Sequence, residues 1–269
     1  MERTIPAEER RTRILKTLSE KGRATLSELA AEFGVTEVSI RNDLAGLEEK
    51  KLLLRVKGGA VNINNFHDSD DIPVSHKQTL HSREKQLIGQ FAASLVKDGE
   101  SVIIDSGSTT MEVARHLDPS KKLTIITNAL DIAIAMNAND NFQVIVLGGN
   151  IRHISYSTVG MIAESSLKSF YCDKLFLGVD SINARDGIST PNIEEASLNQ
   201  AMIASVKEVI AVFDSSKFDR RSFAHIASLD KINTIITDNH IPDTMREYIT
   251  MQGITLHTVN VDGTNDIQK

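Results

Sequence analysis

Residues 103–117, IIDSGSTTMEVARHL, run from a short apolar segment through a loop of small polar residues into a stretch with helical spacing. The apolar segment ends at Asp105, and the loop contains Gly107 among several hydroxyl side chains. This order is typical of a strand followed by a helix in an α/β sheet. Such loops can bind phosphate groups, because glycine permits close approach and the first helical N–H groups are unpaired. Hydroxyl-rich turns also serve simply as helix caps, so the loop alone leaves both interpretations open.

The same alternation of apolar runs and helical segments extends from Ser82 to the end of the sequence. The apolar runs, each bounded by turn residues, are SVIID, LTIIT, QVIVL, KLFLGV, EVIAVF, NTIIT and ITLHTV. Near-continuous β-branched runs are what strands buried on both faces of a parallel sheet require. We therefore expect residues 82–269 to form a doubly wound, mainly parallel α/β domain.

Polar residues follow most of these predicted strands. In doubly wound folds, ligands bind beyond the carboxyl ends of the strands, near the switch in strand order. The residues at those ends are Asp105, Ser106, Gly107, Ser108, Thr109, Thr110, Asn128, Gly148, Gly149, Arg152, Asp180 and Lys217. Arg152 and Lys217 would supply positive charge. Several polar turns that converge on one sheet edge favour a phosphate site there.

The first sixty residues have a helical period instead. One helix is expected from Ala7 until Gly22, and a second over residues 25–34. Only Val35 then precedes Thr36, which is a good N-cap residue for a third helix. The apolar positions of this third helix share one face: Ile40, Leu44 and Leu47.

Two short helices joined by a tight glycine-containing turn form the helix-turn-helix pattern. The second of them exposes Val38, Arg41 and Asn42 on the side away from its apolar face. Arg pairs with guanine and Asn with adenine in the major groove, while hydroxyls such as those of Thr36 and Ser39 bind phosphates. The alternative is a small helical bundle whose Arg and Asn are merely solvated.

Residues 52–63, LLLRVKGGAVNI, place two apolar segments around Lys57-Gly58-Gly59. This pattern predicts a hairpin, which after a helix-turn-helix would be the wing of a winged helix. Arg55 and Lys57 would lie beside the phosphate backbone of DNA. We therefore interpret residues 1–61 as a winged helix-turn-helix domain that binds double-stranded DNA.

The charge is distributed unevenly along the chain. The net charge is -6, yet residues 1–57 carry 12 Lys and Arg against 10 Asp and Glu, which leaves 18 against 26 for the rest. This asymmetry agrees with a polyanion-binding end attached to an acidic body.

Residues 62–81 show neither a helical nor a strand period and are predicted to be a linker between the two domains. Histidines 67, 76 and 81 are residue types that could form a metal site with Asp68, Asp70 and Asp71, but their spacing is irregular, which favours a solvated linker. No cofactor is expected.

The overall composition is that of an ordinary globular protein of about two domains, at 269 residues with 41% hydrophobic and 25% charged residues. No run of 18 apolar residues is present, and the charged N-terminus does not resemble a signal peptide, so we expect a cytoplasmic protein without membrane contact. The single cysteine, Cys172, excludes an intramolecular disulfide and is expected to be a small buried hydrophobe.

Residues 35–61, VTEVSIRNDLAGLEEKKLLLRVKGGAV, resemble the N-terminal signature of the DeoR family of bacterial transcriptional repressors. In this sequence the shared pattern falls on Thr36, Ser39, Ile40, Arg41, Asp43, Leu44, Arg55, Gly58, Gly59 and Ala60. Family members usually have Thr in place of Ser39 and often a second Arg in place of Asn42. The first change keeps the hydroxyl group, whereas the second alters the contact available at that position.

The body resembles the C-terminal domain of the same family, through motifs such as DSGSTT, GGNIR, FLGVD and DSSKF in the family's order. The resemblance implies a fold shared with sugar-phosphate isomerases such as ribose-5-phosphate isomerase, kept as a receptor for a phosphorylated sugar. Where most members have Val-Lys-Arg, this chain has Leu198, Asn199 and Gln200. Together with Glu195, this pattern is nearest to the branch of the N-acetylgalactosamine-pathway repressor. Glu195 and Asn199 thus join the candidate effector-binding residues, and an amino-sugar phosphate or a derived ketose phosphate is favoured.

Three functions fit these features. The first is a repressor of a carbohydrate operon, active as a homodimer or homotetramer and released from operator DNA by a sugar phosphate. The second is an active sugar-phosphate isomerase or deaminase with an appended DNA-binding domain, since the residue types for proton transfer are supplied by Asp105, Asp180, Glu195, Asp214 and Lys217. The third is a DNA-binding protein without a ligand, which leaves the polar strand ends unexplained. We expect the first, with no catalytic residues, because it accounts for both halves of the chain.

Overall fold

The computed structural model describes residues 5–50, 52–56, 58–61, 71–263 and 267–268. The chain divides into two compact units, Met1–Asp70 and Asp71–Lys269, each with its own hydrophobic core.

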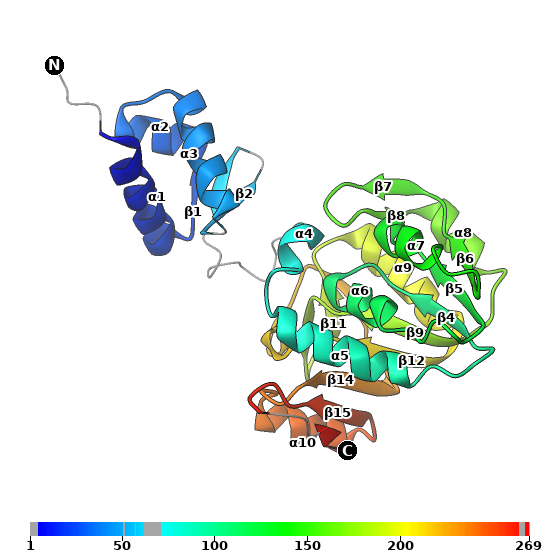
Figure 1. Cartoon of the computed structure of the whole chain (residues 1–269). Helices are drawn as coiled ribbons and strands as arrows, with labels where there is room; N and C mark the ends of the chain where they lie inside the picture. Colours follow the sequence, from blue (N-terminus) through cyan, green and yellow to red (C-terminus); the bar gives the residue numbers. More distant parts are fainter. Residues whose placement is uncertain (1–4, 51, 57, 62–70, 264–266, 269) are drawn as a thin grey trace. The chain divides into compact units, whose positions relative to one another are not determined.

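The first unit combines a helical layer with a small antiparallel sheet (Figure 1). Its helices are α1 (Ala7–Lys21), α2 (Leu26–Phe33) and α3 (Glu37–Glu49). Its strands β1 (Arg23–Thr25), β2 (Leu54–Val56) and β3 (Gly59–Val61) pair in the order β1-β3-β2. The predicted winged helix-turn-helix is confirmed.

Local sequence determines where α2 and α3 begin. Thr25 caps α2 in a capping box with Glu28, and Gly34 ends this helix in the left-handed region at φ 63°. Thr36 then caps α3, since its hydroxyl accepts a hydrogen bond from the backbone N–H of Ser39 at 3.3 Å. The predicted core face of α3 is fully buried, with Ile40 at 0% exposure. The turn between the two helices is therefore as short as the sequence indicates.

The wing contains one strand that the sequence analysis did not predict. Strand β1 pairs with β3, and a Cβ atom at Gly59 would lie only 2.2 Å from the carbonyl oxygen of Ala24. Glycine is therefore required at this position for β1 and β3 to approach each other. Strand β1 is three residues long, which is too short to produce a period in the sequence.

The second unit is built on a sheet with strand order β16-β15-β14-β12-β9-β4-β5-β6. The seven predicted apolar runs all form parallel strands of this sheet, which confirms the doubly wound fold. These strands are β4 (Ser101–Ile104), β5 (Leu123–Thr127), β6 (Phe142–Val146), β9 (Cys172–Gly178), β12 (Val206–Val212), β14 (Thr234–Asp238) and β15 (Thr255–Val259). Strand β16 (Ile267–Gln268) pairs antiparallel with β15 and was not predicted.

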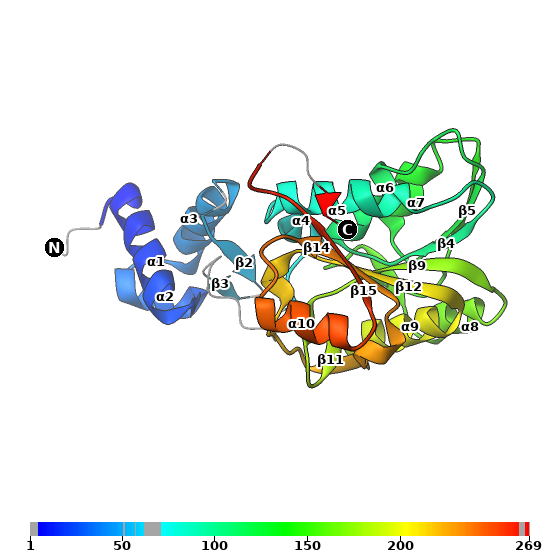
Figure 2. The same ribbon diagram turned by 90° about the horizontal axis from the view of Figure 1, so that it is seen from below.

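Helices cover both faces of the sheet, as Figure 2 shows. One face carries α5 (Ser82–Ser94), α6 (Ser108–Arg115) and α7 (Leu130–Met136), and the other carries α8 (Met161–Leu167), α9 (Ile193–Ala204) and α10 (Asp243–Met251). Alternate strand residues supply the two cores: Leu175 and Leu177 belong to one, and Phe176 between them belongs to the other. Burial on both faces explains the continuous apolar runs.

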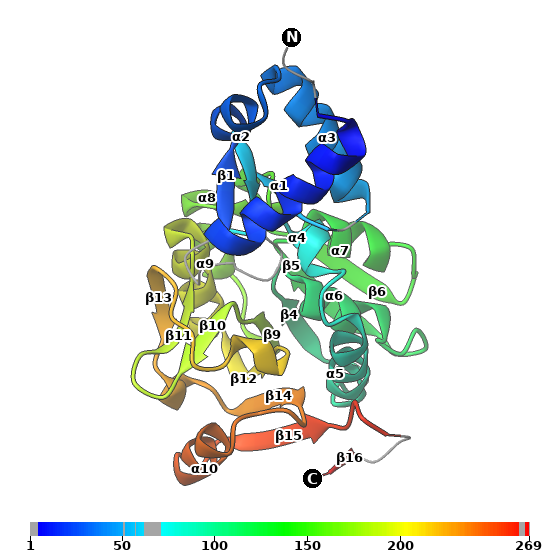
Figure 3. The same cartoon turned by 90° about the vertical axis from the view of Figure 1, so that its left-hand side faces the viewer.

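Two small sheets lie outside the main one. A hairpin joins β7 (Asn150–Arg152) and β8 (Ser157–Val159), and an antiparallel sheet joins β10 (Ser181–Asn183), β11 (Gly187–Thr190) and β13 (Ala224–Ala227) in that order (Figure 3). Short 3-10 helices, η1 (Ser215–Lys217) and η2 (Leu229–Lys231), follow strands β12 and β13. These strands of three or four residues escaped the sequence analysis because they are shorter than the window that periodicity needs.

The predicted linker, residues 62–81, overlaps the second unit, which starts at Asp71. Residues 71–81 include helix α4 (Val74–Lys77), whose Val74 is only 4% exposed. The backbone N–H of Val74 also donates to the carbonyl of Ile154 at 2.8 Å. A four-residue helix leaves no period in the sequence, which is why this stretch was predicted to be part of the linker.

Strand order reverses between β4 and β9. Strand β4 is the first of the parallel strands in the chain, β5 and β6 extend the sheet on one side of it, and β9, β12, β14 and β15 extend it on the other. This is the switch point at which doubly wound folds bind ligands. Among the described residues, no helix is both long and apolar enough to span a membrane.

Candidate functional site

A cavity lies at the carboxyl ends of β4 and β9, at the switch point. Ten of the fourteen predicted effector residues line it: Asp105, Ser106, Gly107, Ser108, Thr109, Asn128, Asp180, Glu195, Asn199 and Lys217. Nine residues that were not predicted to bind effector also line it: Asp71, Ile72, Val74, Lys77, Lys85, Ser155, Gly178, Val179 and Thr190. The convergence of distant loops on one sheet edge therefore occurs as expected from the order of the strands.

The other four predicted residues, Thr110, Gly148, Gly149 and Arg152, are not among those that line the cavity. The hydroxyl of Thr110 donates to the carbonyl of Gly107 at 3.0 Å and so stabilises the loop. A Cβ atom at Gly149 would lie 2.5 Å from the carbonyl oxygen of Val159, so this glycine allows β7 and β8 to pair. These two residues support the architecture of the site.

The loop after β4 has the geometry of an anion site. Ser108 and Thr109 lie in the first turn of α6 and are buried. The helical hydrogen bonds begin with the backbone N–H of Met111, which donates to the carbonyl of Gly107 at 3.0 Å. The preceding N–H groups have no helical partner, and the helix dipole adds partial positive charge at this end. An anion placed here would accept those hydrogen bonds.

The cavity holds carboxyl groups with opposite pKa shifts. Burial, reinforced by the charge of Glu195, raises the pKa of Asp105 to about 8. Burial also raises the pKa of Glu195, against the lowering effect of Arg152. For Asp180 burial acts in the same direction, but Lys77 and Lys217 outweigh it and hold the pKa at about 2. At neutral pH the site therefore combines a protonated Asp105 with an ionised Asp180.

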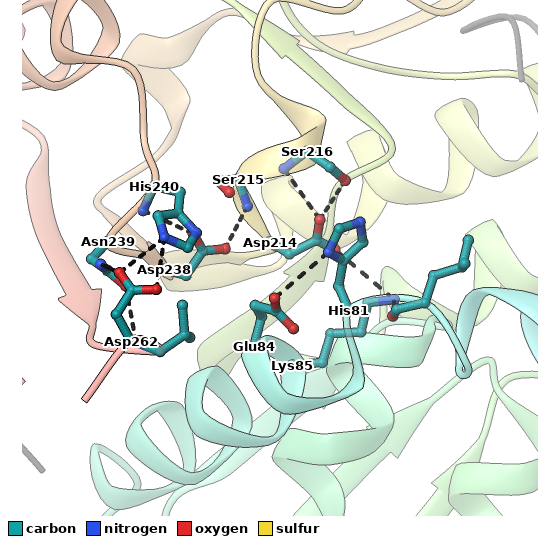
Figure 4. A network of polar contacts seen from close by, with 12 residues as sticks. His81, Glu84, Lys85, Asp214, Ser215, Ser216, Asp238, Asn239, His240 and Asp262 are labelled. Carbon is teal, nitrogen blue, oxygen red and sulfur yellow. Dashed lines mark hydrogen bonds and ion pairs between the residues drawn. The ribbon is translucent and has the colours of Figure 1, made fainter. Parts of the chain in front are cut away.

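Two further lysines approach the cavity from α5 and η1. Lys85 is 3% exposed, and burial lowers its pKa to about 8 although Asp214 opposes the shift. Its ammonium lies 3.9 Å from the carboxylate of Asp214, within the polar network that Figure 4 shows. Burial likewise lowers the pKa of Lys217, opposed by Asp214 and Asp180. The site thus gathers positive charge at the carboxyl edge of the sheet.

Arg152 has carboxylate partners within the protein. Its guanidinium pairs with both Asp71 and Glu195 and donates to the hydroxyl of Ser155 at 3.1 Å. The sequence predicts that Arg152 supplies positive charge to the ligand. In the structure this guanidinium already has two carboxylate partners, one of which is the Glu195 that lines the cavity.

Asn128 carries an unpaired acceptor beside the cavity. Its Nδ2 atom faces the carbonyl of Thr158 at 3.4 Å, whereas its buried Oδ1 atom has no hydrogen-bond partner among the described residues. A buried amide oxygen without a partner costs about 1–3 kcal/mol. A ligand hydroxyl would supply the missing donor.

The predicted DNA-binding residues of α3 lie on its exposed side. Arg41 and Asn42 are exposed, and Val38 is 61% exposed. The hydroxyls of Thr36 and Ser39 lie 3.1 Å apart at the start of the helix. Among the described residues, the ion pair of Arg41 is a long, solvent-exposed contact of 3.5 Å with Glu37, which solvent screens.

In the wing, Arg55 of β2 is exposed and lies 3.6 Å from Glu48. Lys57, also predicted to bind DNA, lies outside the described residues. Arg41 and Asn42 of α3 and Arg55 of the wing thus present exposed side chains that can donate hydrogen bonds, as a groove-binding surface requires.

The described part of the chain contains no cluster of His, Cys, Asp and Glu that could hold a metal ion. Asp71, His76 and His81 form no such group, and His67, Asp68 and Asp70 lie outside the described residues. Cys172 is 2% exposed, and burial raises the pKa of its thiol, which makes it a buried hydrophobe and a poor nucleophile.

Comparison with known proteins agrees with this architecture. Residues 10–66 match the model of the DeoR-like helix-turn-helix domain, and residues 80–239 match that of the DeoR C-terminal sensor domain. The chain is 36% identical over 252 residues to a protein of Escherichia coli O157:H7 described as "Putative aga operon transcriptional repressor", covering 94% of both chains. It is 34% identical over 259 residues to the HTH-type transcriptional regulator GlpR of Haloferax volcanii, covering 96% of this chain and 98% of the relative.

Among solved structures, the sorbitol operon regulator SorC of Klebsiella pneumoniae covers 89% of this chain and 97% of its own, with 11% identity and a TM-score of 0.42. Ribose 5-phosphate isomerase A of Methanocaldococcus jannaschii covers 51% of this chain and 54% of its own, with 16% identity and a TM-score of 0.38. The two matched domain models and the full-length relatives decide between the alternatives left by the sequence. The chain therefore belongs to the DeoR family of transcriptional repressors, as a DNA-binding regulator with a sensor domain rather than an enzyme.

Proposed function

We propose that this regulator represses a carbohydrate operon and that a phosphorylated sugar, bound in the cavity of the second unit, changes its affinity for operator DNA. The observation that carries the proposal is the composition of the cavity at the β4/β9 switch point. One part of it, the start of α6 with Lys217, suits a phosphate. The other part, with Asp180, Glu195 and the amide side chains, suits sugar hydroxyls.

The lining residues suit a ligand with an anionic group at one end and several hydroxyl groups at the other. Hydroxyl groups need both acceptors and donors, and the cavity supplies acceptors on Asp180 and on the unpaired Oδ1 of Asn128. Asn199, 5% exposed on α9, adds an amide beside Asp105. Because Asn199 stands where most family members have Lys, an amino-sugar phosphate or its ketose derivative is the favoured effector. The protein described as a putative aga operon repressor matches this chain over 94% of its length.

For the DNA contact, we assign base reading to Arg41 and Asn42 of α3, beside Val38, and phosphate contacts to Thr36, Ser39 and the wing residues Arg55 and Lys57. Helix-turn-helix proteins of this kind bind paired half-sites as symmetric dimers. A homodimer or homotetramer is therefore the proposed active form. The operator affinity of the two bound copies would then depend on the state of both sensor units.

Substitution of Arg41 by Ala is expected to weaken operator binding by about 10- to 100-fold, because a bidentate contact to guanine contributes about 1–3 kcal/mol. The DNA is a duplex that the wild-type protein selects from a randomised pool, and binding is measured by fluorescence anisotropy. Arg13→Ala is the matched control, since Arg13 is also 54% exposed and also pairs with a Glu four residues earlier. Equal losses for the two variants would contradict the assignment of Arg41.

A titration with sugar phosphates tests the sensor function directly. In the wild type, at least one hexose 6-phosphate from a panel with amino-sugar and ketose members is expected to change operator affinity, whereas the unphosphorylated sugars are not. Lys217→Met should shift the effective concentration upward by about tenfold or more, because a charge-assisted contact to phosphate is lost. Lys207→Met, which changes an exposed lysine of β12, should respond like the wild type. A wild-type protein that is indifferent to every sugar phosphate would contradict the proposal.

A further inference from the structure

Residues 71–80, which we call the strap, belong to the second unit although the sequence analysis placed them in a linker. The strap follows residues 62–70, which connect it in sequence to β3 of the DNA-binding unit. It is held at several points along its length. The ammonium of Lys85 donates to the carbonyls of Lys77 at 2.5 Å and of Leu80 at 2.6 Å.

The strap also forms one wall of the effector cavity. Its Asp71, Ile72, Val74 and Lys77 all line the cavity. Ile72 and Val74 are apolar and partly or fully buried, so they separate the polar groups of the cavity from solvent. A ligand in the cavity would therefore touch the strap as well as the strand ends.

Two ion pairs join the strap to residues at the strand ends. The ammonium of Lys77 lies 2.5 Å from the carboxylate of Asp180, and the side chains of this pair are only 19% and 23% exposed. Asp71 pairs with Arg152, which also holds Glu195. Burial lowers the pKa of Lys77, but the nearby carboxylates, Asp180 first and then Glu195 and Asp71, together raise it above its ordinary value.

A sugar phosphate would compete with these pairs. A phosphate attracts the Lys77 ammonium away from Asp180, because an anion with several acceptor oxygens offers it charge-assisted hydrogen bonds. The sugar hydroxyls in turn bind the carboxylates of Asp180 and Glu195, and the position of Glu195 depends on Arg152 and thereby on Asp71. The ligand would share these groups with their present partners and would add charge and hydrogen bonds beside them, so occupancy of the cavity changes the free energy with which the strap is held.

We propose that Lys77 is an effector-contacting residue and that the pairs Lys77–Asp180 and Asp71–Arg152 couple occupancy of the cavity to the strap, and through it to the DNA-binding unit. This inference rests on the proposed function. It assigns the coupling to the strap because residues 62–70 are the direct covalent path from the strap to the DNA-binding unit. Coupling between two ligands requires an element whose free energy both of them alter, and the strap meets that requirement from the effector side.

The test compares operator affinity without effector and at saturating effector. The effector is whichever sugar phosphate gives the largest response in the wild-type titration. The ratio of the two operator dissociation constants is independent of effector affinity at saturation, and it is typically about 5- to 150-fold in coupled systems. In Asp71→Asn, which removes the charge that pairs with Arg152, this ratio is expected to fall most of the way to one. Asp71→Glu keeps the charge and should restore most of the ratio.

Lys77→Met tests the contact itself. Isothermal titration should show its effector affinity reduced by about tenfold for the sugar phosphate, because a charge-assisted hydrogen bond to phosphate is lost. Binding of the corresponding unphosphorylated sugar should change much less. Tyrosine fluorescence checks that the sensor unit remains folded, since Tyr156, Tyr171 and Tyr248 all belong to it and the sequence has no Trp.

Glu100→Gln is the matched control. Glu100 is a partly buried carboxylate that pairs with Lys174, as Asp71 pairs with Arg152, but it precedes β4 at the opposite edge of the sheet. In Glu100→Gln, the ratio of operator dissociation constants with and without effector should equal that of the wild type. A wild-type ratio in Asp71→Asn would overturn the coupling role of the strap, and unchanged effector affinity in Lys77→Met would overturn the contact. A wild-type protein that responds to no sugar phosphate would instead contradict the proposed function.

Discussion

Replacement of Asp43 by Ala is expected to unfold the DNA-binding unit and to abolish operator binding while the sensor unit stays folded. The Asp43 side chain is 3% exposed inside the first unit and accepts from the guanidinium of Arg10 at 2.5 Å and from that of Arg11 at 3.1 Å. These contacts tie α3 to α1 across the helix-turn-helix. Removal of one partner from a buried ion pair costs about 3–5 kcal/mol, because the remaining charge has no compensation.

The size of the first unit makes this loss decisive. Small domains are marginally stable, and a loss of a few kcal/mol is a large part of their free energy of unfolding. Arg11 is 33% exposed and can be solvated, but the Arg10 side chain is only 10% exposed and would keep an unpaired charge. The contact of Arg10 with the carbonyl of Ile5 at 3.1 Å does not neutralise it.

Two spectroscopic signals separate the units in this experiment. All three tyrosines lie in the sensor unit, so their fluorescence reports on that unit, while circular dichroism reports on helices of both units. Asp43→Ala should lose helical signal at a temperature at which tyrosine fluorescence is still native. Glu9→Ala, which breaks an exposed ion pair with Arg13 in the same unit, should cost less than about 1 kcal/mol. Equal stability of Asp43→Ala and the wild type would show that the buried pair contributes nothing.

Asp43 also illustrates what the sequence could not predict. The sequence analysis places it only in the shared family pattern and gives it no role, whereas the structure buries it against α1. An isolated acidic residue in an amphipathic helix gives no sign of its partner, because Arg10 and Arg11 lie more than thirty residues earlier in the chain. The apolar face of the same helix was predictable, since Ile40, Leu44 and Leu47 repeat at helical spacing and are all buried.

The same contrast holds for the effector cavity. Residues directly after predicted strands, such as Asp105 and Asp180, could be placed at one sheet edge because parallel strands bring their carboxyl ends together. Lys77 and Lys85 could not be placed there from the sequence, since they line the cavity from α4 and the start of α5 and do not follow a strand. The polar stretch around Lys77 has the composition of a linker, and only its contacts in three dimensions assign it to the site.

Asp105→Asn is expected to stabilise the sensor unit more at pH 8 than at pH 5, by on the order of 4 kcal/mol, because each pH unit between the two pKa values contributes about 1.4 kcal/mol. The pKa of Asp105 in the folded chain is about 8, above its ordinary value of 3.8, because burial and the nearby Glu195 disfavour the charged form. Between about pH 4 and pH 8 the folded chain therefore keeps a proton that the unfolded chain has lost. Stability falls as the pH rises through this window, since the folded state binds more protons than the unfolded state. Asparagine has a similar shape and stays neutral, so the variant does not lose stability as the pH rises through this window.

Asp180 provides the opposite case within the same cavity. Lys77 and Lys217 hold its pKa at about 2, below the ordinary value, so its contribution to stability is present above about pH 4 and disappears as the pH falls toward 2. Asp180→Asn should therefore destabilise the sensor unit at pH 7, because it leaves Lys77 without its carboxylate partner. Melting curves followed by tyrosine fluorescence between pH 5 and pH 8 should show the Asp105→Asn advantage growing with pH while the Asp180→Asn deficit persists. If the effect of Asp105→Asn on the melting temperature were the same at every pH from 5 to 8, Asp105 would titrate in its ordinary range and would be ionised in the resting cavity.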